Sequence, residues 1–447
     1  MNIVLPVQKR LKHFEEEERV LNKEEAITEA KRCEMCENAP CESASPLGLP
    51  VRAFLRNLQD QHFDEAYRLV KIVNPFPKIS SKICDAHALC EKGCKLDKKI
   101  QIRRLQRFIC EQGKPPEQEK VKLLKKSIGI VGAGPAGLAC AAELSKKGYF
   151  STVYDALPYQ GGHLTMRIPL YKLSKETCVE DLGKLPNVTY QQNTIVGKTV
   201  HLAELQQKHD AIFLALGANT PQVISIPGIE KGNVFLAHDL LMRVHHFQAH
   251  EKKHVPLKIG KHVVVLGSSE VALDTARTLR RLGTQVTLIS EQDYSQITAH
   301  HESLKRAQEE EIQCILLTQV EKILGKKDVE SVQCIQMMAQ QTESGEVLLS
   351  PLEGSTFTIP CDQVYLALGQ HSTIFSDPTV KIRKSRTGKP IVNEHLQTSE
   401  EGIFAGGEMR LGKVTLEETM ADGKKAAQKI HLWLNNALQK EDDDDVL

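Results

Sequence analysis

Cysteines crowded near the start of the chain are the residues whose type and spacing most clearly indicate chemistry. The chain has 447 residues and 12 cysteines, and seven of these lie between Cys33 and Cys110. The closely spaced groups are Cys33, Cys36 and Cys41, followed by Cys84, Cys90 and Cys94. Structural zinc takes four ligands from two short knuckles, whereas iron-sulfur clusters bind runs of cysteine thiolates. Because the first group is not two pairs, we favour iron-sulfur clusters over zinc.

A glycine pattern farther along the chain indicates nucleotide binding. An apolar run at residues 128–131 leads through Gly132, Gly134, Pro135, Ala136 and Gly137 into an alanine-rich helical pattern. In a G-x-G-x-x-G turn, one glycine permits the tight turn, one lets the backbone approach a pyrophosphate, and one lets helix and strand pack closely. The next expected strand ends at Asp155, about 20 residues on, where a ribose hydroxyl needs an acceptor. The sequence therefore predicts a dinucleotide site here.

The same strand-turn-helix pattern recurs at residues 262–283. Its turn consists of Gly267, Ser268, Ser269, Glu270 and Val271. Ser269 replaces the middle glycine; a serine leaves room for a phosphate and can donate to it, although loss of nucleotide binding is the alternative. The following strand, residues 285–289, leads to Glu291. A carboxylate there would repel a 2′-phosphate and accept from the ribose hydroxyls of NAD, so we expect NADH to be preferred over NADPH.

These patterns need supporting elements, and the length of the chain is enough for roughly three domains. We expect an α/β protein in which a helical N-terminal iron-sulfur domain precedes two Rossmann-like nucleotide-binding domains. Residues 14–31 are polar and charged, which favours surface helices, and residues 47–71 are expected to be helical. The formal net charge is +1, so no general affinity for nucleic acid or anionic membranes is expected. Without a long apolar run or a signal peptide's apolar core, the expected location is cytoplasmic.

The N-terminal motifs RCEMCENAPCESASP, CDAHALCEKGC and IQIRRLQRFI carry a specific resemblance. They resemble the two-cluster domain shared by the small subunit of glutamate synthase and by dihydropyrimidine dehydrogenases. This resemblance implies one 4Fe-4S cluster on Cys33, Cys36, Cys41 and Cys94. It implies a second cluster on Cys84, Cys90, Gln106 and one further cysteine, at the position that Ser45 occupies in this chain.

The serine at position 45 leaves the second cluster open to three outcomes. The hydroxyl binds iron, the cluster is reduced in iron or lost, or another thiol substitutes. Cys110 is one helical turn beyond Gln106, so we consider it as a substitute, with a buried unligated thiol as the alternative. The basic stretch from Lys95 to Arg107 fits either an acidic electron-transfer partner or a solvated helix face.

Three separated segments resemble FAD-binding flavoproteins: GGHLTMRIPLYKL from Gly161, GIFAGGE from Gly402, and the closing motif from Val414. Lys172 stands where the family usually has arginine, and Glu408 where aspartate is commoner. The resemblance implies that FAD is bound by Gly132, Gly134, Pro135, Ala136, Gly137, Asp155, Gly162, Leu164, Lys172, Gly217, Gly407, Glu408 and Thr415. It also implies that the chain crosses between the nucleotide domains after the strands that end at Gly217 and Gly369.

The resemblance covers nearly the whole chain and indicates its domain boundaries. We expect an iron-sulfur domain at 1–121, an FAD domain at 122–248 and 366–438, a nicotinamide domain at 249–365, and an acidic tail at 439–447. The motifs PCE and RLQRF, with the acidic strand end, most resemble the flavin subunit of NAD-dependent dihydropyrimidine dehydrogenase. The implied function is electron transfer from NADH through FAD and one or two 4Fe-4S clusters to an FMN-containing catalytic partner subunit.

Three other functions are alternatives to this one. A glutamate synthase small subunit is the first, although the basic NADPH signature is missing. A thioredoxin-reductase-like enzyme is disfavoured because the later cysteines contain no C-x-x-C pair. A non-catalytic redox sensor or scaffold is the third, because Ser45 and Ser269 both depart from the family at cofactor sites. No catalytic side chain is expected, since the hydride passes directly between cofactors.

Overall fold

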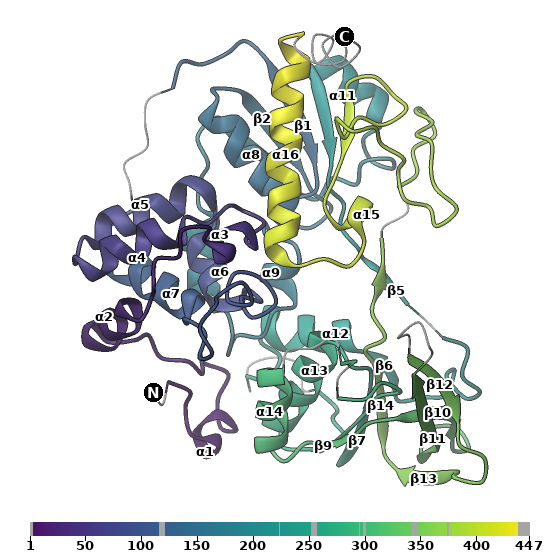
Figure 1. The fold of residues 1–447 in the computed structure, drawn as a ribbon. Helices are drawn as coiled ribbons and strands as arrows, with labels where there is room; N and C mark the ends of the chain where they lie inside the picture. The colour runs from purple at the N-terminus through teal and green to yellow at the C-terminus, as the bar shows by residue number, and fades with distance from the viewer. Residues whose placement is uncertain are drawn as a thin grey trace.

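The computed structural model describes residues 3–115, 121–222, 224–251, 257–294, 296–297, 301–341, 347–372 and 375–436. It consists of a helical N-terminal part and two α/β parts, with the long helix α16 (Leu416–Leu434) running beside the upper sheet (Figure 1). The predicted fold class is confirmed. The predicted acidic tail at 439–447 lies outside the described residues.

The N-terminal part is a cluster of short helices. They are α1 (Val7–Arg10), α2 (Lys23–Lys31), α3 (Pro40–Ser43), α4 (Val51–Gln59), α5 (Phe63–Val73), α6 (Pro77–Ile83) and α7 (Ile102–Gln112). Apolar residues spaced three and four apart give α4 and α7 one buried stripe each, and these stripes share one core. The helical structure expected for residues 47–71 is present as α4 and α5, the second of which extends to Val73.

The expectation of surface helices across residues 14–31 is only half right. Helix α2 begins after Asn22, whose side chain accepts from the Glu25 N–H at 2.9 Å. Residues 14–22 are not helical, and Glu17 within them is only 1% exposed. We call residues 14–19 the acidic strap. Its glutamates find arginine partners on distant elements, and these tertiary contacts override the local preference for a solvated helix.

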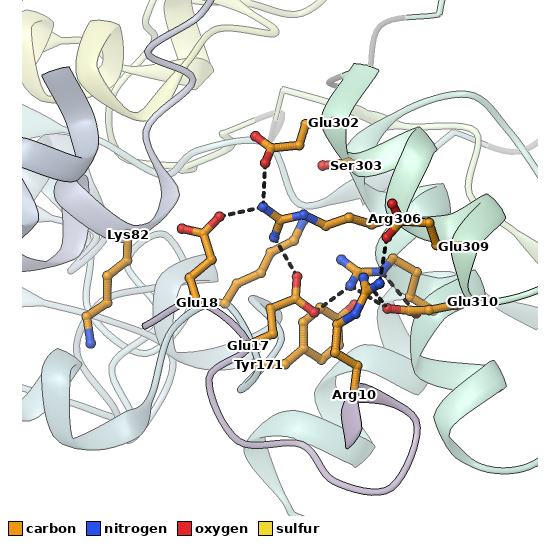
Figure 2. A network of polar contacts seen from close by, with 12 residues as sticks. Arg10, Glu17, Glu18, Lys82, Tyr171, Glu302, Ser303, Arg306, Glu309 and Glu310 are labelled. Carbon is orange, nitrogen blue, oxygen red and sulfur yellow. Dashed lines mark hydrogen bonds and ion pairs between the residues drawn. The ribbon is translucent and has the colours of Figure 1, made fainter. Parts of the chain in front are cut away.

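The acidic strap joins all three parts of the molecule (Figure 2). Glu17 forms ion pairs with Arg277 at 2.5 Å, Arg281 at 2.9 Å and Arg306 at 2.7 Å. The Arg281 guanidinium also lies 4.0 Å from the ring centre of Tyr171. Although burial alone would raise it, the charges of Arg277, Arg306 and Arg281 lower the pKa of Glu17 to about 2. Glu17 of the strap is therefore the centre of a buried network of ion pairs.

The upper α/β part is built on a five-stranded parallel sheet with the order β16-β4-β1-β2-β3. Its strands are β1 (Ser127–Val131), β2 (Phe150–Tyr154), β3 (Val188–Gln191), β4 (Ala211–Leu214) and β16 (Ile403–Ala405). Its other helices are α8 (Pro135–Lys146), α9 (His163–Met166), α10 (Lys175–Leu182), α11 (Leu202–Lys208) and α15 (Glu408–Leu411). Because β16 pairs with β4, the end of the chain completes a sheet that begins before residue 130.

Helices α8 and α16 pack closely against each other, as small side chains allow. A Cβ atom on Gly423 would lie less than 3.0 Å from the carbonyl oxygen of Ala136. Residues of both helices belong to one buried core with the strands β1 and β4. This contact fixes the N-terminal end of α16 beside the glycine-rich turn.

The lower α/β part repeats the architecture with the parallel order β6-β14-β7-β8-β9. Its strands are β6 (Val234–Leu236), β7 (His262–Leu266), β8 (Gln285–Ile289), β9 (Gln313–Ile315) and β14 (Gln363–Leu366). Its helices are α12 (Ala237–Leu241), the π-helical turn η1 (Met242–His246), α13 (Glu270–Arg281) and α14 (His301–Glu309).

An antiparallel sheet flanks the lower part, and two chain crossings connect it to the upper part. The flanking strands are β10 (Thr318–Leu324), β11 (Ser331–Gln341), β12 (Val347–Pro351) and β13 (Phe357–Pro360). The crossings pair as β5 (Thr220–Pro221) and β15 (Gln370–His371) (Figure 1). Among the described residues, no helix combines the length and apolar character needed to cross a membrane.

Candidate cofactor sites

A cavity of about 770 Å³ lies at the meeting of the three parts and holds most of the predicted flavin residues. This volume is in the range of cofactor sites. The predicted residues that line it are Gly132, Gly134, Pro135, Ala136, Asp155, Gly162, Leu164, Lys172, Gly217, Glu270, Gly407 and Glu408. They come from segments far apart in the sequence, so the fold brings the separated motifs together.

The three glycines of the first turn differ in what surrounds them. Gly132 has φ +111° and packs against Ala215. A Cβ on Gly137 would lie less than 3.0 Å from the carbonyl oxygen of Gly132, so this glycine permits helix-strand packing. A Cβ on Gly134 would meet nothing within 4 Å and would project into open space. That space, at the N-terminal end of α8, fits the pyrophosphate of a dinucleotide.

Asp155 holds the turn as well as facing the cavity. Its Oδ2 accepts from the Ala133 N–H at 2.6 Å, and its Oδ1 accepts from the Leu157 N–H at 2.8 Å. Burial raises the pKa of this carboxyl. The carboxylate is thus fixed at the end of β2, the position expected for the ribose acceptor.

The opposite wall of the cavity is formed by the segment before α16. The Gly407 N–H donates to Asp422 Oδ2 at 2.6 Å, and burial raises the pKa of Glu408. Thr415 caps α16: its Oγ1 accepts from the Glu418 N–H at 3.2 Å, while its own N–H donates to Glu418 Oε2 at 2.7 Å. Thr415 itself does not line the cavity, but its neighbours Val414 and Leu416 do. The positive end of the α16 dipole therefore faces the cavity.

A group around His163 was not singled out from the sequence. His163 Nε2 lies 2.8 Å from both Arg167 Nη1 and Asn219 Oδ1, and all three residues line the cavity. Burial, and then the Arg167 charge, lower the pKa of His163 to about 4. An uncharged imidazole is therefore held at this wall. The quoted segment GGHLTMR contains both the histidine and the arginine, but nothing in it indicates that they meet Asn219.

Lys172 lies at the seam between the two α/β parts. Its Nζ contacts Glu270 Oε2 at 2.8 Å and Asp274 Oδ1 at 2.5 Å, both on α13. Although burial alone would lower it, these two carboxylates raise the pKa of Lys172. Besides lining the cavity, the lysine therefore ties the flavin part to α13.

The second glycine turn retains its shape despite the serine. Gly267 has φ +136° and packs against Ala367, while Gly369 has φ +98°. Ser269 lies at the N-terminal end of α13, just before Glu270 and Val271. Its Oγ is buried and makes no hydrogen bond within the described part of the chain. Such a hydroxyl fits a bound phosphate.

Two further residues predicted to bind the nicotinamide nucleotide are Ser268, in the second glycine turn, and Glu291, after β8. Ser268 Oγ donates to Gln292 Oε1 at 2.5 Å. Glu291 is exposed just beyond β8. Thr298, a position at which the family resemblance implies a second basic residue in NADPH-using proteins, lies outside the described residues.

The first cysteine group, Cys33, Cys36 and Cys41, surrounds a small space together with Cys94. A cavity of about 30 Å³ is lined by Cys33, Cys36, Cys41 and Cys94. A Cβ on Gly93 would lie 2.5 Å from the Pro40 carbonyl oxygen, so this glycine lets its loop approach α3. Burial and the neighbouring Glu42 raise the pKa of the Cys41 thiol to about 11. The four cysteines fit a 4Fe-4S cluster, whose formation would displace their protons.

The second cysteine group lies between the first group and the flavin cavity. Cys84 ends α6 and lines that cavity, and Cys90 is 5% exposed. Burial raises the pKa of both thiols; Cys84 and Cys90 are neighbours, and Cys41 of the first group is near Cys90. Gln106 is buried on α7, where its Nε2 donates to the Pro77 carbonyl at 3.2 Å. Cys84 thus brings the second group to the edge of the flavin cavity.

The described side chains do not form a site for a single metal ion. Within the described ranges, no three His, Cys, Asp or Glu side chains are placed to hold one metal ion. A 4Fe-4S cluster distributes its ligands over several iron atoms, whereas zinc takes its ligands at one point.

Ser45 and Cys110, the two substitutes considered for the second group, each have contacts of their own. The Ser45 Oγ accepts from the Leu49 N–H at 3.1 Å, within its own turn. Cys110 is 2% exposed, and its charged neighbours are Asp181, Lys71 and Lys78 on other helices. The structure therefore favours a buried unligated thiol at position 110.

The basic stretch from Lys95 to Arg107 divides into the exposed lysines Lys95, Lys98 and Lys99 and three arginines that form ion pairs inside the molecule. Arg103 pairs with Glu18 at 3.1 Å, Arg104 with Glu18 at 3.5 Å, and Arg107 with Glu16 at 2.7 Å. These three arginines anchor the acidic strap, so they do not form a face for an acidic partner.

The chain matches two protein families. Residues 126–436 match the family described as pyridine nucleotide-disulphide oxidoreductase. Residues 10–117 match the family described as dihydropyrimidine dehydrogenase domain II, 4Fe-4S cluster. The two families cover both α/β parts and the helical part.

Individual relatives extend over nearly the whole chain. The small chain of glutamate synthase [NADPH] from Azospirillum brasilense is 31% identical, with 96% of this chain and 93% of the relative covered. The NAD-dependent dihydropyrimidine dehydrogenase subunit PreT of Escherichia coli (strain K12) is 28% identical, with 92% and 95% covered. Among solved structures, FprA from Mycobacterium tuberculosis in complex with NADPH superposes with a TM-score of 0.59 at 19% identity, covering 71% of this chain and 86% of FprA. This last likeness concerns the fold alone.

Proposed function

The chain belongs to the pyridine nucleotide-disulphide oxidoreductase family, and on that premise we propose that it is an electron-input subunit. It takes electrons from NADH onto FAD and passes them through two 4Fe-4S clusters to a catalytic partner subunit. The observation that carries the proposal is the position of Cys84. This cysteine lines the same cavity as the glycine-rich turn, so the flavin and cluster sites adjoin.

The cofactors would supply the chemistry, since a flavin accepts one hydride, and with it two electrons, and can release these electrons singly to iron-sulfur clusters. The chain's own residues would bind and orient them. Gly134 and the N-terminal end of α8 would hold the pyrophosphate, and Asp155 would accept from the ribose. Glu408 would contact the ribityl chain, and the N-terminal end of α16 would stabilise negative charge on the flavin.

The cluster ligands would be divided as the fold groups them. Cys33, Cys36, Cys41 and Cys94 bind the first cluster. Cys84, Cys90 and Gln106 bind the second, which lies nearer the flavin cavity. The neighbouring positions of Cys90 and Cys41 support transfer from the second cluster to the first.

The nicotinamide nucleotide would bind at the second glycine turn, with the unpartnered Ser269 hydroxyl donating to a phosphate. Glu291 at the end of β8 supports NADH as the preferred donor, because its charge would repel the 2′-phosphate of NADPH.

The partner is proposed to be the FMN-containing catalytic subunit of a dihydropyrimidine dehydrogenase. The name of the PreT relative and the acidic residue at position 291 support it. A glutamate synthase is the second candidate, because its small chain from Azospirillum brasilense shares 31% identity with this chain.

An anaerobic mixing experiment tests the electron-input function. Iron and FAD are quantified per chain, the protein is mixed with NADH or NADPH, and flavin and cluster absorbance are followed. We expect one FAD, about eight irons, fast bleaching by NADH and slow bleaching by NADPH. Bleaching with only about four irons would mean a single relay. No bleaching by either nucleotide would overturn the reductase function and support a scaffold or sensor.

A further inference from the structure

The second cluster site lacks a cysteine, and Ser45 at that position is already engaged. Its hydroxyl accepts from the Leu49 N–H at 3.1 Å in a local turn. A hydroxyl oxygen that accepts one hydrogen bond keeps a second lone pair, so this bond alone does not decide the remaining ligand of a second cluster. Another oxygen ligand close to Cys84 would compete with the serine.

A buried glutamate from the flavin part lies beside this site. Glu417, the second residue of α16, is 5% exposed, and within the described residues neither of its buried carboxylate oxygens receives a hydrogen bond of standard geometry. The donors that lie beside it are the Cys84 thiol and the Ser80 hydroxyl. Within the described residues, no lysine or arginine forms an ion pair with it. The adjacent Glu418 caps the helix, so capping does not account for Glu417.

A carboxyl this buried stays protonated unless its ionised form gains hydrogen bonds, a cation or a metal. Its polar neighbours are the Cys84 thiol and the Ser80 hydroxyl, and Cys90 is also close. Ser80 Oγ is itself buried and makes no hydrogen bond of standard geometry within the described residues. Three of the unsatisfied oxygens of the described residues, two on Glu417 and one on Ser80, therefore lie beside the second cysteine group.

We propose that the carboxylate of Glu417 is the fourth ligand of the second 4Fe-4S cluster, together with Cys84, Cys90 and Gln106. The proposal rests on the second cluster of the proposed function. A carboxylate carries the same single negative charge as the thiolate that it would replace, and oxygen ligands bind iron. Because α16 also borders the flavin cavity, the ligand would link the cluster directly to the flavin part.

Iron content and electron paramagnetic resonance of the full chain test the proposal. Protein purified anaerobically is analysed for iron and FAD, then reduced with dithionite for spectra. We expect about eight irons in the wild type, and about four in Glu417→Ala with one cluster signal lost and FAD retained. Ser45→Ala and the capping control Glu418→Ala should keep about eight irons.

A rescue variant separates ligation from a structural role. Adding Ser45→Cys to Glu417→Ala should return iron to about eight per chain, because it restores the cysteine that relatives have. If Glu417→Ala cannot be purified, Glu417→Cys should retain the iron but shift the g values of one signal. An unchanged spectrum in Glu417→Cys would overturn the proposal.

The remaining outcomes distinguish this proposal from the function on which it rests. About eight irons and unchanged spectra in Glu417→Ala would overturn the ligand assignment alone. Iron loss in Ser45→Ala would assign the ligand to the serine instead. Only about four irons in the wild type would overturn the second relay itself and the Glu417 ligand with it.

Discussion

At the residue scale, the exposed carboxylate of Glu291 carries the proposed preference for NADH. Replacing it by arginine exchanges a repulsive charge for a group that pairs with the 2′-phosphate. A charge-assisted hydrogen bond contributes about 1.5–3 kcal/mol, so Glu291→Arg should shift the affinity ratio toward NADPH by roughly tenfold to a hundredfold. The rate of flavin bleaching measured against the concentration of each nucleotide gives this ratio.

The neutral variant Glu291→Gln is the matched control for that change. It removes the repulsion without adding a cation, so its ratio should fall between those of the wild type and Glu291→Arg. If arginine leaves the ratio unchanged, nucleotide choice is made by other residues.

At the scale of a single strand-turn-helix unit, Gly134 and Gly137 should respond differently to alanine. Gly137→Ala would place a Cβ less than 3.0 Å from the Gly132 carbonyl oxygen, and overpacking of this kind costs about 1–3 kcal/mol. Gly134→Ala meets open space at φ −80°, so its effect on the stability of the FAD-free protein should stay within about 0.5 kcal/mol. Its added methyl occupies the pyrophosphate space, and FAD binding should weaken.

Denaturant unfolding of the FAD-free protein and titration with FAD separate these two effects. Equal losses of stability in both variants would mean that Gly134 has a packing role. Undiminished FAD binding in Gly134→Ala would place the pyrophosphate elsewhere.

Elements that depend on local pattern were the ones predicted from the sequence. Residues 285–289 were expected as a strand and form β8, because a short apolar run bounded by turns specifies a buried strand locally. The partners of Glu17 and the neighbours of Glu417 could not be predicted, because they lie on elements hundreds of residues away in the sequence. A run of glutamates has the same local appearance whether solvent or buried arginines surround it.

At the scale of the whole molecule, the acidic strap holds the nicotinamide part against the rest of the chain. Glu18 contacts Arg306 of α14, as Figure 2 shows, and also Arg103 of the helical part. Glu17 contacts Arg277 of α13. Removing one partner of a buried ion pair costs about 3–5 kcal/mol, because the other charges are left uncompensated. The relative placement of the flavin and nicotinamide sites therefore depends on these carboxylates remaining ionised.

The acidic strap should make the stability of the fold depend on pH. The arginines lower the pKa of both Glu17 and Glu18 from 4.5 to about 2 in the folded protein, although burial alone would raise it. A group with a lowered folded pKa stabilises the fold above its unfolded pKa, and this contribution is lost as pH falls toward the folded pKa. We expect the denaturant midpoint to fall steeply between about pH 5 and pH 3.

The double variant Glu17→Gln/Glu18→Gln should be less stable than the wild type at about pH 6 but should lose less stability between about pH 5 and pH 3. As a control, Glu15→Gln, at an exposed neighbouring residue, should leave the dependence of the denaturant midpoint on pH as it is in the wild type. If the midpoint falls equally steeply with pH in the wild type and in the double variant, the strap is not the source of the acid sensitivity.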